Sequence, residues 1–302
     1  MTEPTRRALH RGDGSASSSS QQETESGRAM LLRWVERPDG RRELWETPLT
    51  REDYLNPQLG DKWVQGKAHG EAILDLADRL KRCFQSRPDM MILFDVQHLL
   101  GPGLPKPSPD ISVIRGARHP EKVEGSYDVV KQGVPPCLII EVISPRDSRI
   151  REIDEHDKVE IYQRTGIPEY LLLELPRQPA GRHRIFGYRL DPAGRYQRIV
   201  PDGEDRLFSE TTKLWFSISP EGDRVMIRDA ATGQLVRTSE EEAQGRKLAE
   251  GQVKREAEAR QAEAEARKAA EAKAEREAEA RKAAEAEVAR LRAEIERLRA
   301  GG

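Results

Sequence analysis

The last 65 residues of the chain are built almost entirely from Ala, Glu, Arg and Lys. Residues 238–302 carry 16 acidic and 15 basic side chains, and the ten-residue block Glu263–Ala272 recurs unchanged at Glu277–Ala286. These residue types are strong helix formers, and opposite charges four residues apart stabilise a helix surface. The segment lacks the apolar residues of a core. It therefore predicts a long charged helix, and any globular domain must come from the residues before it.

Near the end of this segment, Val288, Leu291, Ile295 and Leu298 follow a 3-4-3 spacing. This spacing is typical of a coiled-coil seam, so we expect a homo-oligomer that forms through the C-terminal helix. The apolar positions farther upstream are alanines in a different register, which weakens the seam. A solitary, solvated helix therefore stays open as the alternative.

The residues before the tail divide into two parts. Residues 1–29 are rich in Ser, Gln, Glu and Gly without apolar periodicity, which predicts disorder. Residues 30–237 carry the patterns of a mixed α/β domain with a central sheet flanked by helices. Its expected elements are a hairpin around Pro38-Asp39-Gly40, a helix between Gly66 and Pro88, strands at Met91–Val96, Asp110–Ile114 and Cys137–Ile143, a helix at Ser148–Thr165, a strand at Tyr170–Leu173 and further strands to about residue 230.

Composition excludes several classes of protein. The two cysteines, Cys83 and Cys137, have no paired spacing, which excludes disulfide scaffolds and zinc ribbons. No apolar run approaches the roughly 18 residues that span a bilayer, and no signal-peptide core is present, so we expect a cytoplasmic protein without membrane contact. The net charge of −2 argues against a basic footprint over the whole chain.

One acidic residue lies inside an apolar strand. Glu141 stands in the run Leu138–Ile143, where an ionised carboxylate is costly unless a charged group meets it. Asp110 opens the preceding strand, and two carboxylates on neighbouring strands would repel each other. A divalent cation such as Mg²⁺ resolves this conflict, because it takes oxygen ligands and needs only one or two carboxylates.

Lys158 follows Asp154 by four residues on the next expected helix. An ammonium beside carboxylates and a metal can stabilise a phosphate or orient the attacking water. The alternative is a plain surface ion pair, which would stabilise the helix by a few tenths of a kcal/mol.

These segments together resemble the Uma family of endonucleases, part of the restriction-endonuclease-like PD-(D/E)XK superfamily. The resemblance is carried by Pro109-Asp110, Glu141-Val142-Ile143-Ser144-Pro145, Asp154 with Lys158 and Tyr162, and Gly166-Ile167-Pro168-Glu169-Tyr170. It is dense over residues 109–174 and extends over about 60–230. It implies a mixed central sheet flanked by helices, a Mg²⁺ site that Mn²⁺ can also occupy, and hydrolysis of phosphodiester bonds in DNA.

The resemblance also implies roles for individual residues. Asp110 and Glu141 would hold the metal with the carbonyl of Val142, and Lys158 would assist catalysis with Asp154 in support. The superfamily's usual lysine, two residues after the second acid, falls on Ile143 here. Lys158 matches the place from which Uma-like proteins supply it.

Two further sets of residues are candidates. His69 and Glu71 lie on the first long helix, either in support of the site or as surface residues opposite its apolar face; we favour the surface interpretation. Three arginines near the site, Arg146, Arg149 and Arg151, are the best candidates for phosphate contacts. Because Ile143 replaces the usual lysine, a catalytically inactive DNA-docking or interaction module that self-associates through its tail remains the competing function.

Overall fold

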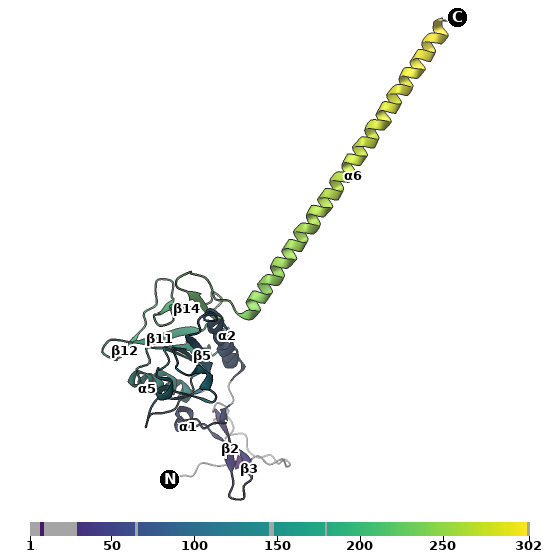
Figure 1. The fold of residues 1–302 in the computed structure, drawn as a ribbon. Helices are drawn as coiled ribbons and strands as arrows, with labels where there is room; N and C mark the ends of the chain where they lie inside the picture. The colour runs from purple at the N-terminus through teal and green to yellow at the C-terminus, as the bar shows by residue number, and fades with distance from the viewer. Residues whose placement is uncertain (1–6, 9–28, 64–65, 145–147, 179, 301–302) are drawn as a thin grey trace. The chain divides into compact units, whose positions relative to one another are not determined.

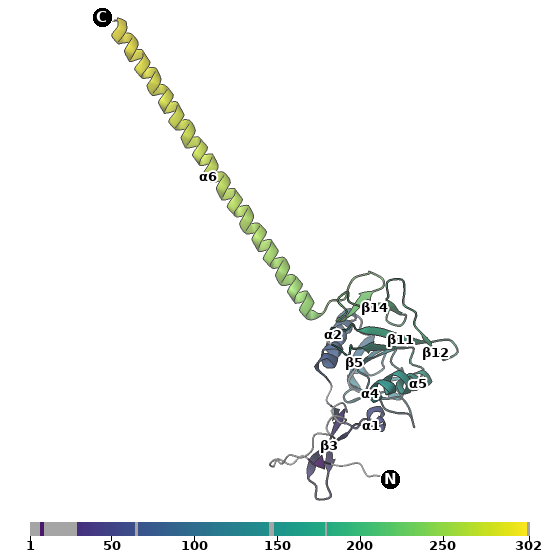
Figure 2. The ribbon, with the colours of Figure 1, turned by 180° about the vertical axis from the view of Figure 1, so that it is seen from behind.

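The computed structural model describes residues 7–8, 29–63, 66–144, 148–178 and 180–300. The chain divides into two compact units, Met1–Ser239 and Glu240–Gly302 (Figures 1 and 2). The first unit contains all the candidate site residues and is described first.

A six-stranded mixed sheet forms the centre of the first unit. Its strand order is β12-β11-β10-β9-β7-β5, and β9 and β10 are its parallel pair while the other neighbours are antiparallel. The strands are β5 (Met90–Phe94), β7 (Ile111–Arg115), β9 (Leu138–Ile143), β10 (Glu169–Glu174), β11 (Arg184–Leu190) and β12 (Tyr196–Arg198). All six residues of β9 are buried, as expected for a strand covered on both faces. The predicted mixed α/β architecture is confirmed.

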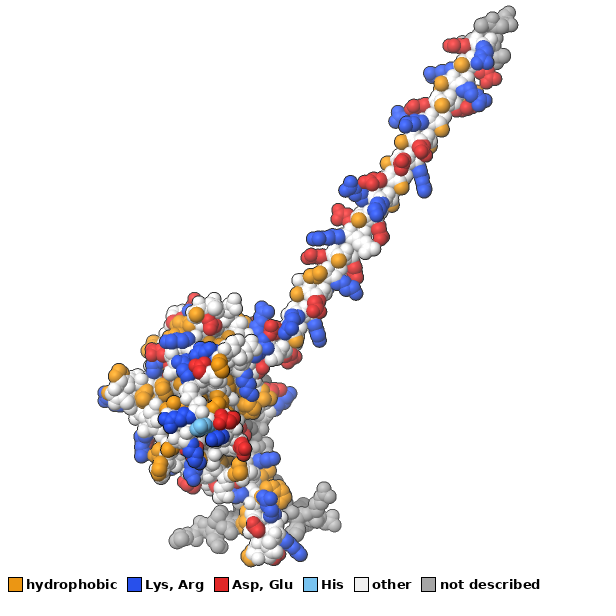
Figure 3. Space-filling model, in the orientation of Figure 1, with side chains coloured by type: hydrophobic (Ala, Val, Ile, Leu, Met, Phe, Trp, Pro, Cys, Tyr) orange, Lys and Arg blue, Asp and Glu red, His pale blue; other side chains and the backbone are white. Residues whose placement is uncertain are grey.

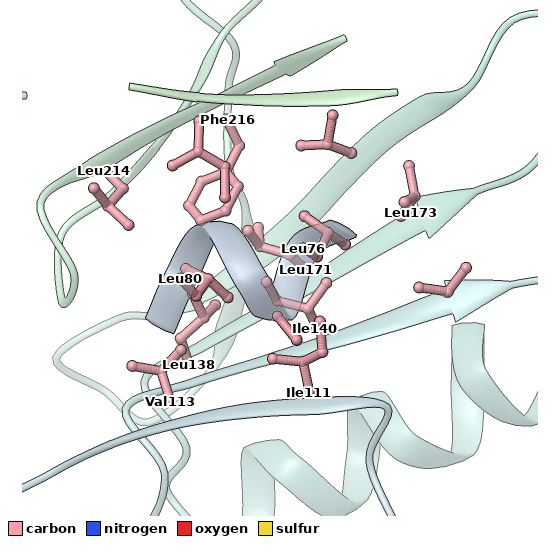
Figure 4. Close-up of a cluster of buried hydrophobic side chains, with 14 of the residues drawn as sticks. Leu76, Leu80, Ile111, Val113, Leu138, Ile140, Leu171, Leu173, Leu214 and Phe216 are labelled. Carbon is pink, nitrogen blue, oxygen red and sulfur yellow. The ribbon is translucent and has the colours of Figure 1, made fainter. Parts of the chain in front are cut away.

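Helix α2 (Lys67–Cys83) and a small second sheet cover one face of the central sheet. The second sheet contains β13 (Leu207–Ser209), β14 (Leu214–Ile218) and β15 (Val225–Asp229). In Figure 4, Leu76 and Leu80 of α2 meet Leu138 and Ile140 of β9, while Phe216 of β14 approaches from the second sheet. This packing supplies the larger hydrophobic core.

The other face of the sheet packs against a helical segment that runs from residue 148 to residue 164. It consists of α4 (Ser148–Glu152), a π-helical turn η2 (Ile153–Asp157) and α5 (Lys158–Arg164). The amide of Lys158 donates to the carbonyl of Ile153, five residues earlier, which makes the turn wider than an α-helix. The sequence predicted one uninterrupted helix here. Such π-turns are frequent at functional sites, and this one carries Asp154.

The remaining elements form the periphery of the first unit. The predicted hairpin is confirmed as β2 (Met30–Glu36) and β3 (Arg42–Pro48), with β4 (Lys62–Trp63) beside β2. The sequence did not predict α1 (Arg51–Leu55), β6 (Gln97–Leu99), β8 (Ser126–Asp128), η1 (Pro120–Lys122) or α3 (Val129–Gln132). β1 (Arg7–Ala8) pairs with β3, so these two residues differ from the predicted disorder. The rest of residues 1–28 lies outside the described residues.

The second unit is the greater part of one helix, α6 (Ser239–Ala300). Its 62 residues give a length of roughly 90 Å at 1.5 Å per residue. The helix begins before Gly245 and Gly251 and includes both of them. Acidic and basic side chains are interspersed along it (Figure 3). Among the described helices of the protein, none is long and apolar enough to cross a membrane.

Candidate active site

The register of β7 and β9 places two acidic residues side by side. Ile111 pairs with Ile140, so the next positions outward are Asp110 and Glu141. The amide of Asp110 donates to Glu141 Oε2 at 3.3 Å. The amide of Val142 donates to Asp110 Oδ2 at 2.7 Å. The backbone of each strand thus holds the carboxylate of the other.

The helical segment brings two more charged groups to these acids. Lys158 Nζ lies 2.7 Å from Glu141 Oε1 and 2.9 Å from Asp154 Oδ1. Glu141, Asp154 and Lys158 are each almost fully buried. Glu141 lies two residues before Ile143 and faces the same side of β9, so the ammonium reaches the acid from the helix that covers this face. The alternative of a surface pair between Asp154 and Lys158 is wrong, because both side chains are buried.

Two tyrosines complete the hydrogen bonding of the charged groups. The hydroxyl of Tyr162 donates to Glu141 Oε1 at 3.1 Å. The hydroxyl of Tyr54 donates to Asp154 Oδ1 at 3.2 Å and accepts from Lys158 Nζ at 3.3 Å. The ammonium also lies 4.4 Å from the centre of the Tyr54 ring, within the range of a cation–π interaction. The three N–H groups of Lys158 are therefore matched by Glu141, Asp154 and Tyr54.

Sequence reasoning assigned no role to Tyr54 and named Tyr162 only among the residues that carry the family resemblance. Tyr162 follows Lys158 by four residues on α5, and this spacing puts both on one face of the helix. The sequence therefore contained a signal that Tyr162 lies beside Lys158. Tyr54 lies on a five-residue helix without a recognisable pattern, 100 residues from its partner Asp154.

His69 lies inside the site, and its expected surface position is wrong. Its side chain is 8% exposed, and Nε2 lies 3.4 Å from Asp110 Oδ1. The spacing explains this, because positions 69, 73 and 76 share one face of a helix, and Ile73 and Leu76 are buried. Among the described residues, neither ring nitrogen of His69 has a hydrogen-bond partner of good geometry. A buried imidazole with unsatisfied nitrogens is a polar group directed at Asp110.

Glu71 does not reach the site. Its side chain is exposed, and its carboxylate lies 3.4 Å from Lys67 Nζ on the same helix. The structure therefore places Glu71 where the surface interpretation expects it.

The charge of the cluster is unbalanced, since it contains three carboxylates and one ammonium, which contacts Glu141 and Asp154. Burial raises the pKa of Glu141 to about 8; the ammonium of Lys158 opposes this shift, and the charges of Asp110 and Asp154 add to it. Burial would lower the pKa of Lys158, but Asp154 and Glu141 raise it well above its usual value. The ammonium thus stays charged, and Glu141 and Asp154 share it as their cationic partner.

Asp110 behaves differently from Glu141. Burial would raise its pKa, but His69, Lys158 and the amide of Val142 together lower it. One member of the acidic pair is thereby kept ionised, while the other readily takes up a proton. Such unequal carboxylates are typical of sites that bind cations or transfer protons.

The oxygen atoms at the end of β9 fit a hard divalent cation. Among the described residues, the hydrogen bond that Glu141 Oε2 accepts is the long one from Asp110, whereas Oε1 is held by Lys158 and Tyr162. The carbonyl of Ile143 accepts from Leu175 on the β10 side. Because successive strand residues direct their backbone groups to opposite sides, the carbonyl of Val142 points toward Asp110.

This donor set is small. Within the described part of the chain, no group of three His, Cys, Asp or Glu side chains could hold a metal ion. Two carboxylates and a carbonyl are nevertheless sufficient for Mg²⁺, which usually retains several waters. Asp110, Glu141 and the Val142 carbonyl are the residues that could hold it.

The three arginine candidates have different outcomes. Arg151 forms ion pairs with Glu155 and Glu174 on the protein itself, which argues against the predicted phosphate contact. Arg149 is exposed on α4. Arg146 lies outside the described residues.

Comparison with known proteins supports a nuclease-like family. The family model Uma2, described as "Putative restriction endonuclease", matches residues 42–221. A crystal structure from Anabaena variabilis, described as a putative nuclease belonging to DUF820, is similar at 16% sequence identity and a TM-score of 0.33. That similarity covers 47% of this chain and 78% of the other. No curated protein matches the chain.

Proposed function

The chain belongs to the Uma2 family of restriction-endonuclease-like proteins, and from this premise we propose that it is a Mg²⁺-dependent endonuclease that hydrolyses DNA phosphodiester bonds. The observation that carries the proposal is the buried cluster of three carboxylates around one lysine. A cluster with this charge imbalance is costly for a purely structural site, and a divalent cation offsets the excess negative charge.

Asp110, Glu141 and the carbonyl of Val142 would hold Mg²⁺, and Mn²⁺ would substitute for it. The cation supplies Lewis-acid activation of the water and the scissile phosphate. Asp154 and Tyr54 hold the ammonium of Lys158 near Glu141. Lys158 would stabilise the negative charge that develops on the phosphate. His69 would keep Asp110 ionised.

Cleavage of supercoiled plasmid and of linear DNA with Mg²⁺ or Mn²⁺ tests this proposal. The variants are Glu141→Gln and Lys158→Met, with Glu160→Gln and Lys131→Met as matched controls, because these control side chains are 72% and 79% exposed. We expect metal-dependent cutting in the wild type and both controls, and its loss in both site variants.

The same experiment distinguishes the competing function. Cutting that survives in Lys158→Met but not in Glu141→Gln would contradict the assignment of the lysine. If the wild type binds DNA without cutting any substrate with either metal, the chain is a docking module and the enzymatic proposal is wrong.

We also propose that copies of the chain associate through the end of α6. Val288, Leu291 and Ile295 repeat at a spacing of three and four residues, and each is about half exposed on the single helix. In a coiled coil these side chains would lie in the seam. Leu291→Asp in the full chain should shift the sedimentation coefficient toward a monomer, whereas Leu248→Asp, at an exposed apolar position outside the seam, should not. A monomeric wild type at all concentrations would contradict this proposal.

A further inference from the structure

A pocket lies on the opposite side of the π-turn from the acidic cluster. It holds about 350 Å³ and is bounded by α1 and by the segment α4–η2. Its apolar wall comes from Leu49, Tyr54, Ile150 and Ile153. A volume of this size is near the lower end for ligand sites, and it suits one planar group rather than a nucleic-acid duplex.

The π-turn divides its residues between this pocket and the acidic cluster. Ile153, His156 and Asp157 line the pocket. Asp154 and Lys158, one residue away from them, form the cluster with Glu141. Tyr54 belongs to both places, since it lines the pocket and its hydroxyl bonds Asp154. Tyr54 is thus a side chain that the pocket and the proposed site share.

Polar groups border the apolar wall. Arg51 forms two bonds of 2.6 Å to Asp157, which fix its guanidinium in place. Arg149 also lines the pocket. Guanidinium groups bind base edges and phosphates, carboxylates accept hydrogen bonds from base edges, and an apolar wall accepts the face of a base. The combination matches the two chemistries of a nucleotide.

We propose that this pocket takes an unpaired nucleotide of the DNA strand that is cut, next to the scissile phosphate. The inference rests on the proposed function and specifies its substrate: a strand with at least one unstacked base. The base lies against Ile150 and Ile153, and Arg149 binds its flanking phosphate or its edge, while Arg51 stays paired with Asp157. Extruding a base from a duplex costs a few kcal/mol, so single-stranded or mismatched DNA is preferred over perfect duplex.

The test uses the full chain carrying Glu141→Gln and a single-stranded oligonucleotide with one 2-aminopurine, whose fluorescence rises when the base unstacks. Ile150→Trp, added to this background, fills the pocket, and Val200→Trp adds the same side chain at an 83% exposed position. Arg149→Gln probes the border without adding bulk, with Arg41→Gln as its exposed control.

We expect the fluorescence rise in the Glu141→Gln protein and with both controls. Ile150→Trp should abolish it, and Arg149→Gln should weaken oligonucleotide binding about tenfold. An unchanged rise in Ile150→Trp would overturn the inference, as would a loss in Val200→Trp of the same size. Circular dichroism checks that Ile150→Trp folds, and if it does not, Arg149→Gln decides alone.

Cleavage assays separate this inference from the proposed function. Metal-dependent cutting by the wild type without any fluorescence rise in the Glu141→Gln protein leaves an enzyme without the nucleotide pocket, which overturns the inference alone. A rise that Ile150→Trp abolishes, in a protein whose wild type never cuts, supports the pocket and contradicts the catalytic proposal.

Discussion

Two buried glutamates on neighbouring strands have opposite electrostatic surroundings. Glu141 on β9 and Glu169 on β10 are both fully buried, and the two strands pair in parallel. Glu169 receives bonds from the guanidinium of Arg189, from the hydroxyls of Ser209 and Thr211, and from two backbone amides. Glu141 shares one ammonium with Asp154 and faces a second acid.

The difference is the one that we expect between a structural carboxylate and the carboxylate of the proposed site. The charge of Glu169 is matched by Arg189, and its partners attach the β13–β14 region to the central sheet. Around Glu141 the charges are left unmatched, which is typical of functional sites. Both residues lie in segments that resemble the Uma family, so the resemblance alone does not distinguish their roles. The hydrogen-bond and ion-pair partners of the two carboxylates do distinguish them.

The largest expected effect is on catalysis at Glu141. Glu141→Gln should lower the rate of metal-dependent cleavage by about 100- to 1,000-fold, because the amide is a poor ligand for a hard cation. The free energy of unfolding without metal should stay constant or rise, since the substitution removes one of three competing carboxylates. Urea unfolding followed by tryptophan fluorescence measures it, because all four tryptophans lie before residue 239. A large loss of stability would show that Glu141, like Glu169, is a structural carboxylate.

Glu169→Gln should have the reverse effect. Removing the buried charge that pairs with the partly exposed Arg189 should lower the free energy of unfolding by about 3–5 kcal/mol. Any loss of cleavage should follow the loss of folded protein. Glu210→Gln is the control, because Glu210 pairs with the same arginine at 2.8 Å but is 56% exposed and should cost no more than about 1 kcal/mol. Equal costs for the two variants would contradict the structural role of Glu169.

The pH dependence of stability sharpens the comparison further. The pKa of Glu141 is raised in the folded state from 4.5 to about 8, so between these values the folded protein holds a proton that the unfolded chain releases. Stability in EDTA should therefore fall as the pH rises from 5 to 8. The fall should be smaller in Glu141→Gln, and Mg²⁺ should stabilise the wild type more at pH 8 than at pH 6. Parallel pH profiles of the wild type and the variant would contradict this assignment.

The sequence predicted the parts of this site that have local signals. Glu141 stands out because a charged residue in an apolar run needs a partner, and Asp154 and Lys158 are linked by helical spacing. The π-turn was not predictable, because residues 148–164 have the pattern of an ordinary helix. His69 was misplaced although its spacing to Ile73 indicates the buried face. Tyr54 had no signal, since only the tertiary packing of α1 against η2 brings it to Asp154.

The smallest expected effect on the cleavage rate is that of substitutions at Tyr54, and it distinguishes a positioning role of this residue from a packing role. Tyr54→Phe removes the hydroxyl that joins Asp154 and Lys158 but keeps the ring below the ammonium. A hydrogen bond to a charged group contributes about 1.5–3 kcal/mol, although the ammonium can partly replace it with water or substrate. We expect a loss of cleavage rate of about tenfold or less, mainly in kcat because Lys158 is held less firmly.

Tyr54→Leu should lower the cleavage rate further, because it also removes the cation–π contact and part of the wall of the proposed nucleotide pocket. The two variants together separate positioning from packing. If Tyr54 only packs, Phe should retain full activity and an unchanged pH–rate profile, and Leu should lower stability without changing kcat per folded molecule. If Tyr54 holds the ammonium in place, Phe alone should already lower kcat. Substitution of the residues that bond Glu169 should not change kcat in this way. Among the described residues, none of these partners contacts the acidic cluster.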